Sequence, residues 1–151
     1  MPLPIEVQKN LLKARIKPGS VIHFFCNFID PPHFKFFIVL HVDFSQDFLL
    51  IVLINSRIPL LVRNDQNRMA CQILFERDSH QEYLTHDSHV DCSTIFDEIV
   101  IDELLNHLLE HPSDIRAEIS KEEKAQILEK IMQANTITDY DKELIYNSLD
   151  S

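Results

Sequence analysis

Two uninterrupted apolar runs constrain the fold more than any other feature of this 151-residue chain. Residues 36–40 (Phe-Phe-Ile-Val-Leu) and residues 49–54 (Leu-Leu-Ile-Val-Leu-Ile) contain no polar side chain. A strand with one wet face alternates apolar and polar residues, whereas continuous apolar runs are typical of central strands that are covered on both faces. We therefore expect a sheet with protein packed on both of its sides.

Further strand-like segments flank these two runs, and polar or proline-bearing breaks separate them. The predicted strands are residues 21–28, 34–42, 48–55, 70–75 and a less apolar segment at 90–95. They recur roughly every ten to fifteen residues without intervening helices, which favours an antiparallel, partly closed barrel over a parallel sheet. We expect the barrel to occupy residues 20–95.

Helical periodicity marks the start of the chain and its last third. Potential capping boxes begin at Ser120 and Thr138, so that the back half is expected to consist of three helices. The predicted helices are residues 5–14, 97–110, 120–133 and 138–149. The sequence therefore predicts one α+β domain over residues 1–151, a small antiparallel barrel followed by C-terminal helices.

Gly19 is the only glycine in the chain, and it follows a proline in the segment Lys17–Ser20. Pro followed by Gly suits a type II turn, which needs a fixed φ and then a positive φ. A single glycine also excludes the phosphate-binding P-loop, the GxGxxG dinucleotide motif and the GxSxG nucleophile elbow. Several common enzyme classes are thereby removed.

The net charge of −10 is unevenly distributed. Residues 1–63 carry seven Lys or Arg and four Asp or Glu, whereas residues 64–151 carry seven and twenty. Because basic surfaces attract phosphate backbones, we expect any nucleic-acid contact to use the front half. No signal peptide or membrane span is evident, which predicts a cytoplasmic protein without membrane contact.

The three cysteines, Cys26, Cys71 and Cys92, lack CxxC spacing and suit reduced, buried thiols in a cytosol. Cys26 and His41 could be written as a nucleophile and its base, but nothing in the sequence brings them together. A thiolate also needs electropositive surroundings, which this sequence does not display. We expect His41 to be an ordinary buried histidine.

Residues 86–92 contain His, Asp and Cys, which are potential ligands of transition metals. Side chains alternate along a strand, so His86 and Cys92 would share one face while His89 and Asp91 would lie on the other. No complete ligand set converges locally. We expect a polar strand edge and no bound metal.

A third cluster combines two cations with a hydroxyl group. The segment Asp30–Lys35 follows the first predicted strand, and Asn55-Ser56-Arg57 follows the third. In a small meander these segments can emerge at the same end, so that Lys35, Ser56 and Arg57 would share one mouth. Such a set can bind a phosphate and stabilise the charge that develops in phosphoryl transfer. The alternative is that these are solvated turn residues.

The order of these elements resembles the PemK/MazF-like toxin family over roughly residues 16–149. The similarity is one of pattern in five short segments. Residues 17–21 resemble the family's opening "PG-[DS]-[IV]" strand, and Lys35 with residues 37–40 resembles its "RP-VVL" strand. Residues 51–56 resemble its third strand, which ends in Thr or Ser. Residues 88–93 resemble its "S-x-[ILV]-D" strand, and residues 115–120 resemble the "I-G-x-L-S" segment that leads into a helix.

The resemblance implies an SH3-like barrel and a metal-independent endoribonuclease of a toxin–antitoxin system, with no cofactor. In active members the 2′-hydroxyl of single-stranded RNA attacks the adjacent phosphate. The resemblance places Lys35 at the family's catalytic Arg and Ser56 at its Thr or Ser. In the nuclease hypothesis, Arg57 of the same cluster assists them. It further implies RNA bound through the basic front half, an antitoxin-like protein partner and a homodimer formed through the barrel.

A catalytically silent module of the same fold is the competing hypothesis. It would present its acidic helices to a protein partner and serve in binding or regulation. The overall acidity favours this alternative, as does a lysine at position 35, because lysine lacks the planar fork with which arginine grips two phosphate oxygens. The glycine-containing loop that precedes the family's Arg is replaced here by Asp30–Phe34.

Overall fold

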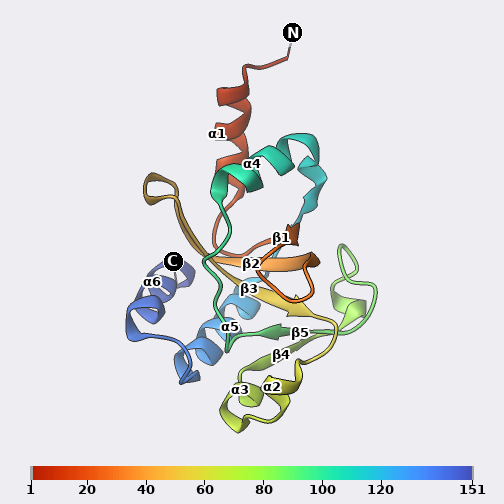
Figure 1. Cartoon of the computed structure of the whole chain (residues 1–151), viewed down its shortest axis with the longest axis vertical. Helices are drawn as coiled ribbons and strands as arrows, with labels where there is room; N and C mark the ends of the chain where they lie inside the picture. Colours follow the sequence, from red (N-terminus) through yellow and green to blue (C-terminus); the bar gives the residue numbers. More distant parts are fainter. Residues whose placement is uncertain (1, 151) are drawn as a thin grey trace.

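A single six-stranded antiparallel sheet forms the centre of the computed structural model, which describes residues 2–150 (Figure 1). The strand order is β4-β5-β3-β2-β1-β6, and the sheet curls into a half-barrel. The strands are β1 (Ser20–Cys26), β2 (His33–Asp43), β3 (Phe48–Asn55), β4 (Gln72–Phe75), β5 (Ser88–Asp91) and β6 (Ile115–Glu118). The prediction of an antiparallel sheet is confirmed.

The central strands β2 and β3 are buried on both faces, as their continuous apolar runs predicted. Alternate residues of β2 enter two separate cores. Phe37 and Val39 point into one, and Ile38 and Leu40 into the other. All four side chains are fully buried.

Helices cover both faces of the sheet (Figure 1). Helices α1 (Ile5–Arg15) and α4 (Ile101–Glu110) share one core, while α5 (Lys121–Gln133) and α6 (Asp139–Leu149) share the other. The remaining helical segments are α2 (Leu60–Arg63), α3 (Gln66–Ala70), and the 3-10 turns η1 (Phe44–Gln46), η2 (Arg77–Ser79) and η3 (Pro112–Asp114). None of the described helices is long and apolar enough to cross a membrane.

Local signals placed the helix starts well. Ser120 and Glu123 form a reciprocal capping box at the start of α5. Thr138 accepts a hydrogen bond from the backbone N–H of Asp141 at the start of α6. Gly19 has a φ of 99°, as its turn required.

The expectation of a barrel confined to residues 20–95 and a purely helical back half was wrong. Strand β6 lies within that half and pairs with β1 at the edge of the sheet. Four residues carry too little periodicity to predict a strand, and β6 exists because the open edge of β1 supplies hydrogen-bonding partners. The short helices α2 and α3 were not predicted either.

Candidate functional site

A pocket of about 480 Å³ lies where β2 begins and β3 ends. Lys35, Ser56 and Arg57 all line it, so the structure brings together the three residues that the sequence singled out. Lys35 lies on β2 itself and not in the preceding loop. The other lining residues are Ile29, Asp30, Pro31, His33, Leu53, Asn55, Pro59, Asp91 and Phe96.

Lys35 is the half-buried cation of this pocket. Its ammonium group donates a hydrogen bond to the side-chain oxygen of Asn55 at the end of β3. Burial lowers the pKa of Lys35, because a desolvated ammonium is less stable than a neutral amine. Cys26 lies nearby as a neutral thiol, since burial raises its pKa to about 11.

Ser56 and Arg57 are exposed at the rim. Within residues 2–150, neither side chain forms a hydrogen bond or an ion pair with another protein group. The Lys35 ammonium has three donors and gives one of them to Asn55. The pocket therefore offers two cations and a hydroxyl group whose donors are available to an external anion.

Asp91 adds an acidic group to the same pocket and was not among the predicted site residues. Its carboxylate is buried and accepts hydrogen bonds from the Ser93 hydroxyl at 2.6 Å, the Ser93 backbone N–H at 3.0 Å and the Gln72 amide at 2.7 Å. These donors compensate much of its charge. An anion in the pocket would bind on the Lys35 and Arg57 side.

A second hollow of about 190 Å³ adjoins the first, and Lys35 and Ser56 line both. Phe34 lines this hollow and is 52 % exposed, and the neighbouring Phe25 is 45 % exposed. The two rings meet edge to face at 5.3 Å, and Phe34 also stacks on His23. Exposed aromatic rings beside cations are typical of surfaces that stack nucleic-acid bases.

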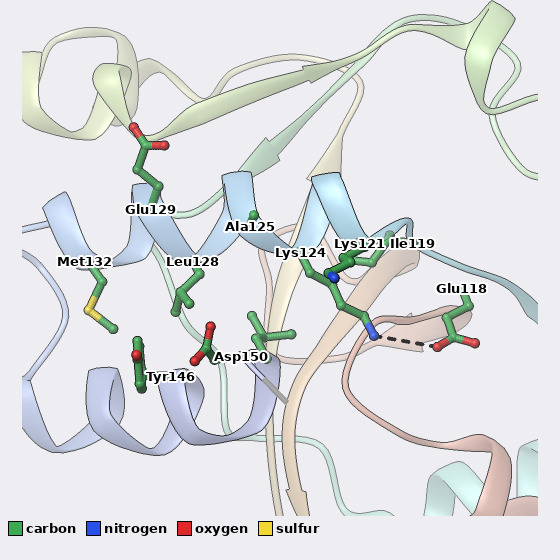
Figure 2. Close-up of a pocket in the computed structure, with 11 residues that line it drawn as sticks. Glu118, Ile119, Lys121, Lys124, Ala125, Leu128, Glu129, Met132, Tyr146 and Asp150 are labelled. Carbon is green, nitrogen blue, oxygen red and sulfur yellow. Dashed lines mark ion pairs between the residues drawn. The ribbon is translucent and has the colours of Figure 1, made fainter.

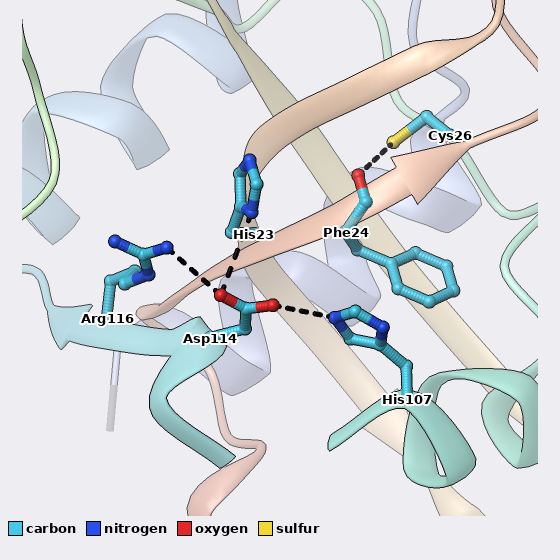
Figure 3. Close-up of polar contacts among 6 residues, drawn as sticks. All are labelled: His23, Phe24, Cys26, His107, Asp114 and Arg116. Carbon is cyan, nitrogen blue, oxygen red and sulfur yellow. Dashed lines mark hydrogen bonds and ion pairs between the residues drawn. The ribbon is translucent and has the colours of Figure 1, made fainter. Parts of the chain in front are cut away.

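A charged cluster centred on Asp114 lies beside β1 (Figure 3). The Asp114 carboxylate accepts hydrogen bonds from His107 Nε2 of α4 at 2.7 Å and from Arg116 of β6 at 3.0 Å, and His23 Nδ1 of β1 lies 3.7 Å away. Burial alone would raise the pKa of Asp114, but these hydrogen bonds outweigh it and hold the pKa below its usual range. Burial lowers the pKa of His23.

The Asp114 cluster ties α4, β6 and β1 together, and no local sequence signal could have found it. His23 and His107 are separated by most of the chain, and only the pairing of β6 with β1 brings Asp114 between them. With its acceptors already occupied by protein donors, Asp114 serves the fold.

The other two candidate clusters do not form sites in the described chain. Cys26 pairs with His33 at one end of β2, whereas His41 lies at the other end and its ring contacts the Ser148 hydroxyl at 2.6 Å. A Cys26–His41 catalytic pair is therefore excluded. Among residues 2–150, no group of three or more His, Cys, Asp or Glu side chains is arranged to hold a metal ion.

Comparison with known proteins adds no assignment to this geometry. No protein-family model matches the sequence, and no curated protein matches it significantly. The functional argument therefore depends on the pocket and its chemistry.

Proposed function

We propose that this protein is a PemK/MazF-like endoribonuclease toxin that cleaves single-stranded RNA in the cytoplasm without a metal ion. The curled sheet would be the SH3-like barrel of that family. The observation that carries the proposal is the convergence of Lys35, Ser56 and Arg57 on one pocket, with both cations free of carboxylate partners in the described chain. An antitoxin-like protein is the expected partner.

The reaction is a transesterification at one phosphate. The 2′-oxygen of the ribose attacks the adjacent phosphorus, the bond to the 5′-oxygen breaks, and the products are a 2′,3′-cyclic phosphate and a 5′-hydroxyl. The Lys35 ammonium can stabilise the negative charge that develops on the phosphate, because its partly desolvated position strengthens that interaction. The attacking 2′-hydroxyl gives up its proton to water. That proton, or one from water, then goes to the leaving 5′-oxygen.

Arg57 and Ser56 would act on the charge that develops during this step. The guanidinium of Arg57 can hold two non-bridging phosphate oxygens, which restores the planar fork that a lysine at position 35 lacks. The Ser56 hydroxyl can donate to a third oxygen. Asn55 is a positioning residue, because it fixes the Lys35 ammonium at the end of β3.

The exposed rings of Phe25 and Phe34 support RNA as the substrate. They lie beside the smaller hollow, which Lys35 and Ser56 line together with the pocket proposed to bind the phosphate. A base next to the scissile phosphate could stack there, and stacking contributes about 1–3 kcal/mol per base. A base can stack on these rings only if it is not paired, so the arrangement requires single-stranded RNA.

The test is cleavage of fluorescently labelled single-stranded RNA in the presence of a chelator. We expect wild-type cleavage to persist, and Lys35→Ala, Ser56→Ala and Arg57→Ala each to lower the rate by about 10²–10³. Lys121→Ala, at an exposed lysine of α5, is the matched control and should change nothing. Binding should weaken as salt rises. Absence of both cleavage and low-salt binding of RNA would refute the proposal.

The catalytically silent binding module remains the second candidate. The acidic surface of α5 and α6 and the carboxylate of Asp91 within the pocket are the observations that favour it. This module would leave RNA intact and let wild-type and Lys35→Ala cells grow equally well when expression is induced. It would instead retain a protein partner on α5 and α6.

A further inference from the structure

The two C-terminal helices leave an open groove between them, which extends to Glu118 at the end of β6 (Figure 2). Its volume is about 800 Å³. Leu128 and Met132 of α5 and Tyr146 of α6 point into it. Met132 is 37 % exposed and Tyr146 is 48 % exposed, so two large side chains of the groove have no cover in the chain itself.

Helix α1 carries a second uncovered apolar surface. It projects from the body of the molecule and packs against α4 (Figure 1). Its side chain Leu12 is buried, whereas Val7, Leu11 and Ala14 are exposed. Leu11 borders a shallow hollow against α4, and Ala14 borders one against β6. These three recur at i, i+4 and i+7 and form one stripe along the helix.

The stripe and the groove match in length and in charge. Ala125, Leu128 and Met132 of the groove span eight residues of helix, as the stripe of α1 does. Residues 5–17 contain four Lys or Arg and one acidic residue, whereas residues 121–150 contain seven Asp or Glu and four Lys. The groove itself is lined by three carboxylates (Glu118, Glu129 and Asp150) and two lysines (Lys121 and Lys124), and Lys124 is paired with Glu118. A basic amphipathic helix therefore complements an apolar groove on an acidic helix pair.

Helix α1 cannot reach the groove of its own chain. Leu12 packs in the core of α1 and α4, while Ile127 and Ile145 pack in the core of α5 and α6 on the opposite face of the sheet. The sheet stands between the helix and the groove. Only a second molecule can supply α1 to this groove.

We infer that the groove between α5 and α6 is a docking site for α1 of a second copy of this chain. Each contact joins two different surfaces, α1 of one copy and the groove of another. Two such contacts related by a two-fold axis close a dimer, and otherwise the contacts continue into rings or longer assemblies. The groove shares no lining residue with the pocket that contains Lys35 and Arg57, and the inference does not depend on the proposed nuclease activity.

The test is the mass in solution, measured by light scattering or analytical ultracentrifugation between about 1 µM and 1 mM, the range of modest specific affinities. We expect the mass to rise above one chain with concentration and to fall as salt increases. Leu11→Glu in the stripe and Met132→Glu in the groove should each weaken association about tenfold or more. Leu61→Glu, at a leucine that is 77 % exposed on α2, is the matched control and should have no effect.

Mixing the two variants gives the sharper result. Leu11→Glu retains an intact groove and Met132→Glu retains an intact α1, so the mixture should form a species of two chains and nothing larger. Circular dichroism must show that both variants fold as the wild type does, and both sites are exposed enough to permit this. A wild type that stays monomeric throughout, or variants that associate normally, would overturn the inference. So would binding of α1 to anionic lipid vesicles without self-association.

Discussion

Helix α1 and the helix pair α5–α6 cover opposite faces of the same sheet, and the contacts that hold them differ. Polar side chains attach α5–α6 to the strands and loops. His80 Nε2 lies 2.5 Å from a Glu123 carboxylate oxygen of α5, and the Thr136 hydroxyl donates to the Ser93 carbonyl at 2.5 Å. These hydrogen bonds position the helix pair on the sheet, in addition to the burial of its apolar side chains.

Helix α1 is attached mainly by apolar packing. Leu12 and Ile16 enter the core that it shares with α4. Its polar links are a local hydrogen bond from the Ser20 hydroxyl to the Arg15 carbonyl at 2.8 Å and the Lys13 ammonium over the ring of Phe44 at 5.6 Å. Apolar burial is less directional than hydrogen bonding, which suits the contact with a second molecule proposed above.

The largest expected effect tests whether both helical layers, each with its own core, contribute to the stability of the fold. Leu104 of α4 and Ile127 of α5 are each fully buried, one on either side of the sheet. Leu104→Ala and Ile127→Ala should each lower the free energy of unfolding by about 2–5 kcal/mol, measured by urea denaturation. A negligible loss at Leu104 would mean that the α1–α4 layer is peripheral to the fold.

The next effect concerns the polar attachment of α5. Glu123 accepts from the Ser120 backbone N–H at 2.8 Å and contacts His80, which stacks on Phe75. Glu123→Gln should lower the free energy of unfolding by about 1–3 kcal/mol at neutral pH, because hydrogen bonds to a charged group are the stronger ones. Glu122→Gln, at an exposed neighbour on α5, should cost less than about 0.5 kcal/mol.

The pH dependence of that effect follows from the pKa of Glu123. Burial alone would raise this pKa, but hydrogen bonds from Ser120 and His80 outweigh it and hold the pKa below its unfolded value of 4.5. The contribution of Glu123 is therefore complete above about pH 4.5 and is lost as the pH falls through the lower folded-state value. Wild type and Glu123→Gln should converge in stability in acid. A difference that persists there would show that the charge is not the cause.

The smallest effect tests the turn at which α1 gives way to β1. Gly19 has a φ of 99°, and a Cβ at this position would lie 2.6 Å from Cε of Lys124 on α5. Gly19→Ala should lower the free energy of unfolding by about 1–2 kcal/mol, because L-residues are strained at positive φ. Lys124→Ala removes the close contact and leaves the strain. If Lys124→Ala rescued Gly19→Ala fully, crowding against α5 would be the cause instead.

Local sequence signals determined most of the secondary structure. The apolar runs of β2 and β3 could only be central strands, and the capping residues Ser120 and Thr138 marked where α5 and α6 begin. Each of these signals acts within a few residues of the chain, so it survives without knowledge of the fold. The sequence also allowed Lys35, Ser56 and Arg57 to converge, because a meander can return its chain to the same end of the sheet. It left solvated turn residues as the alternative, and the structure places all three around one pocket.

The tertiary structure alone decided which distant groups meet. Strand β6 forms only because β1 leaves an open edge, and this pairing places Asp114 between His23 and His107. The bond from Lys35 to Asn55 likewise depends on the register of β2 against β3, which side-chain patterns do not specify to the residue. Apolar periodicity determines which side of a segment is buried, but the geometry of the folded chain determines which polar groups contact one another.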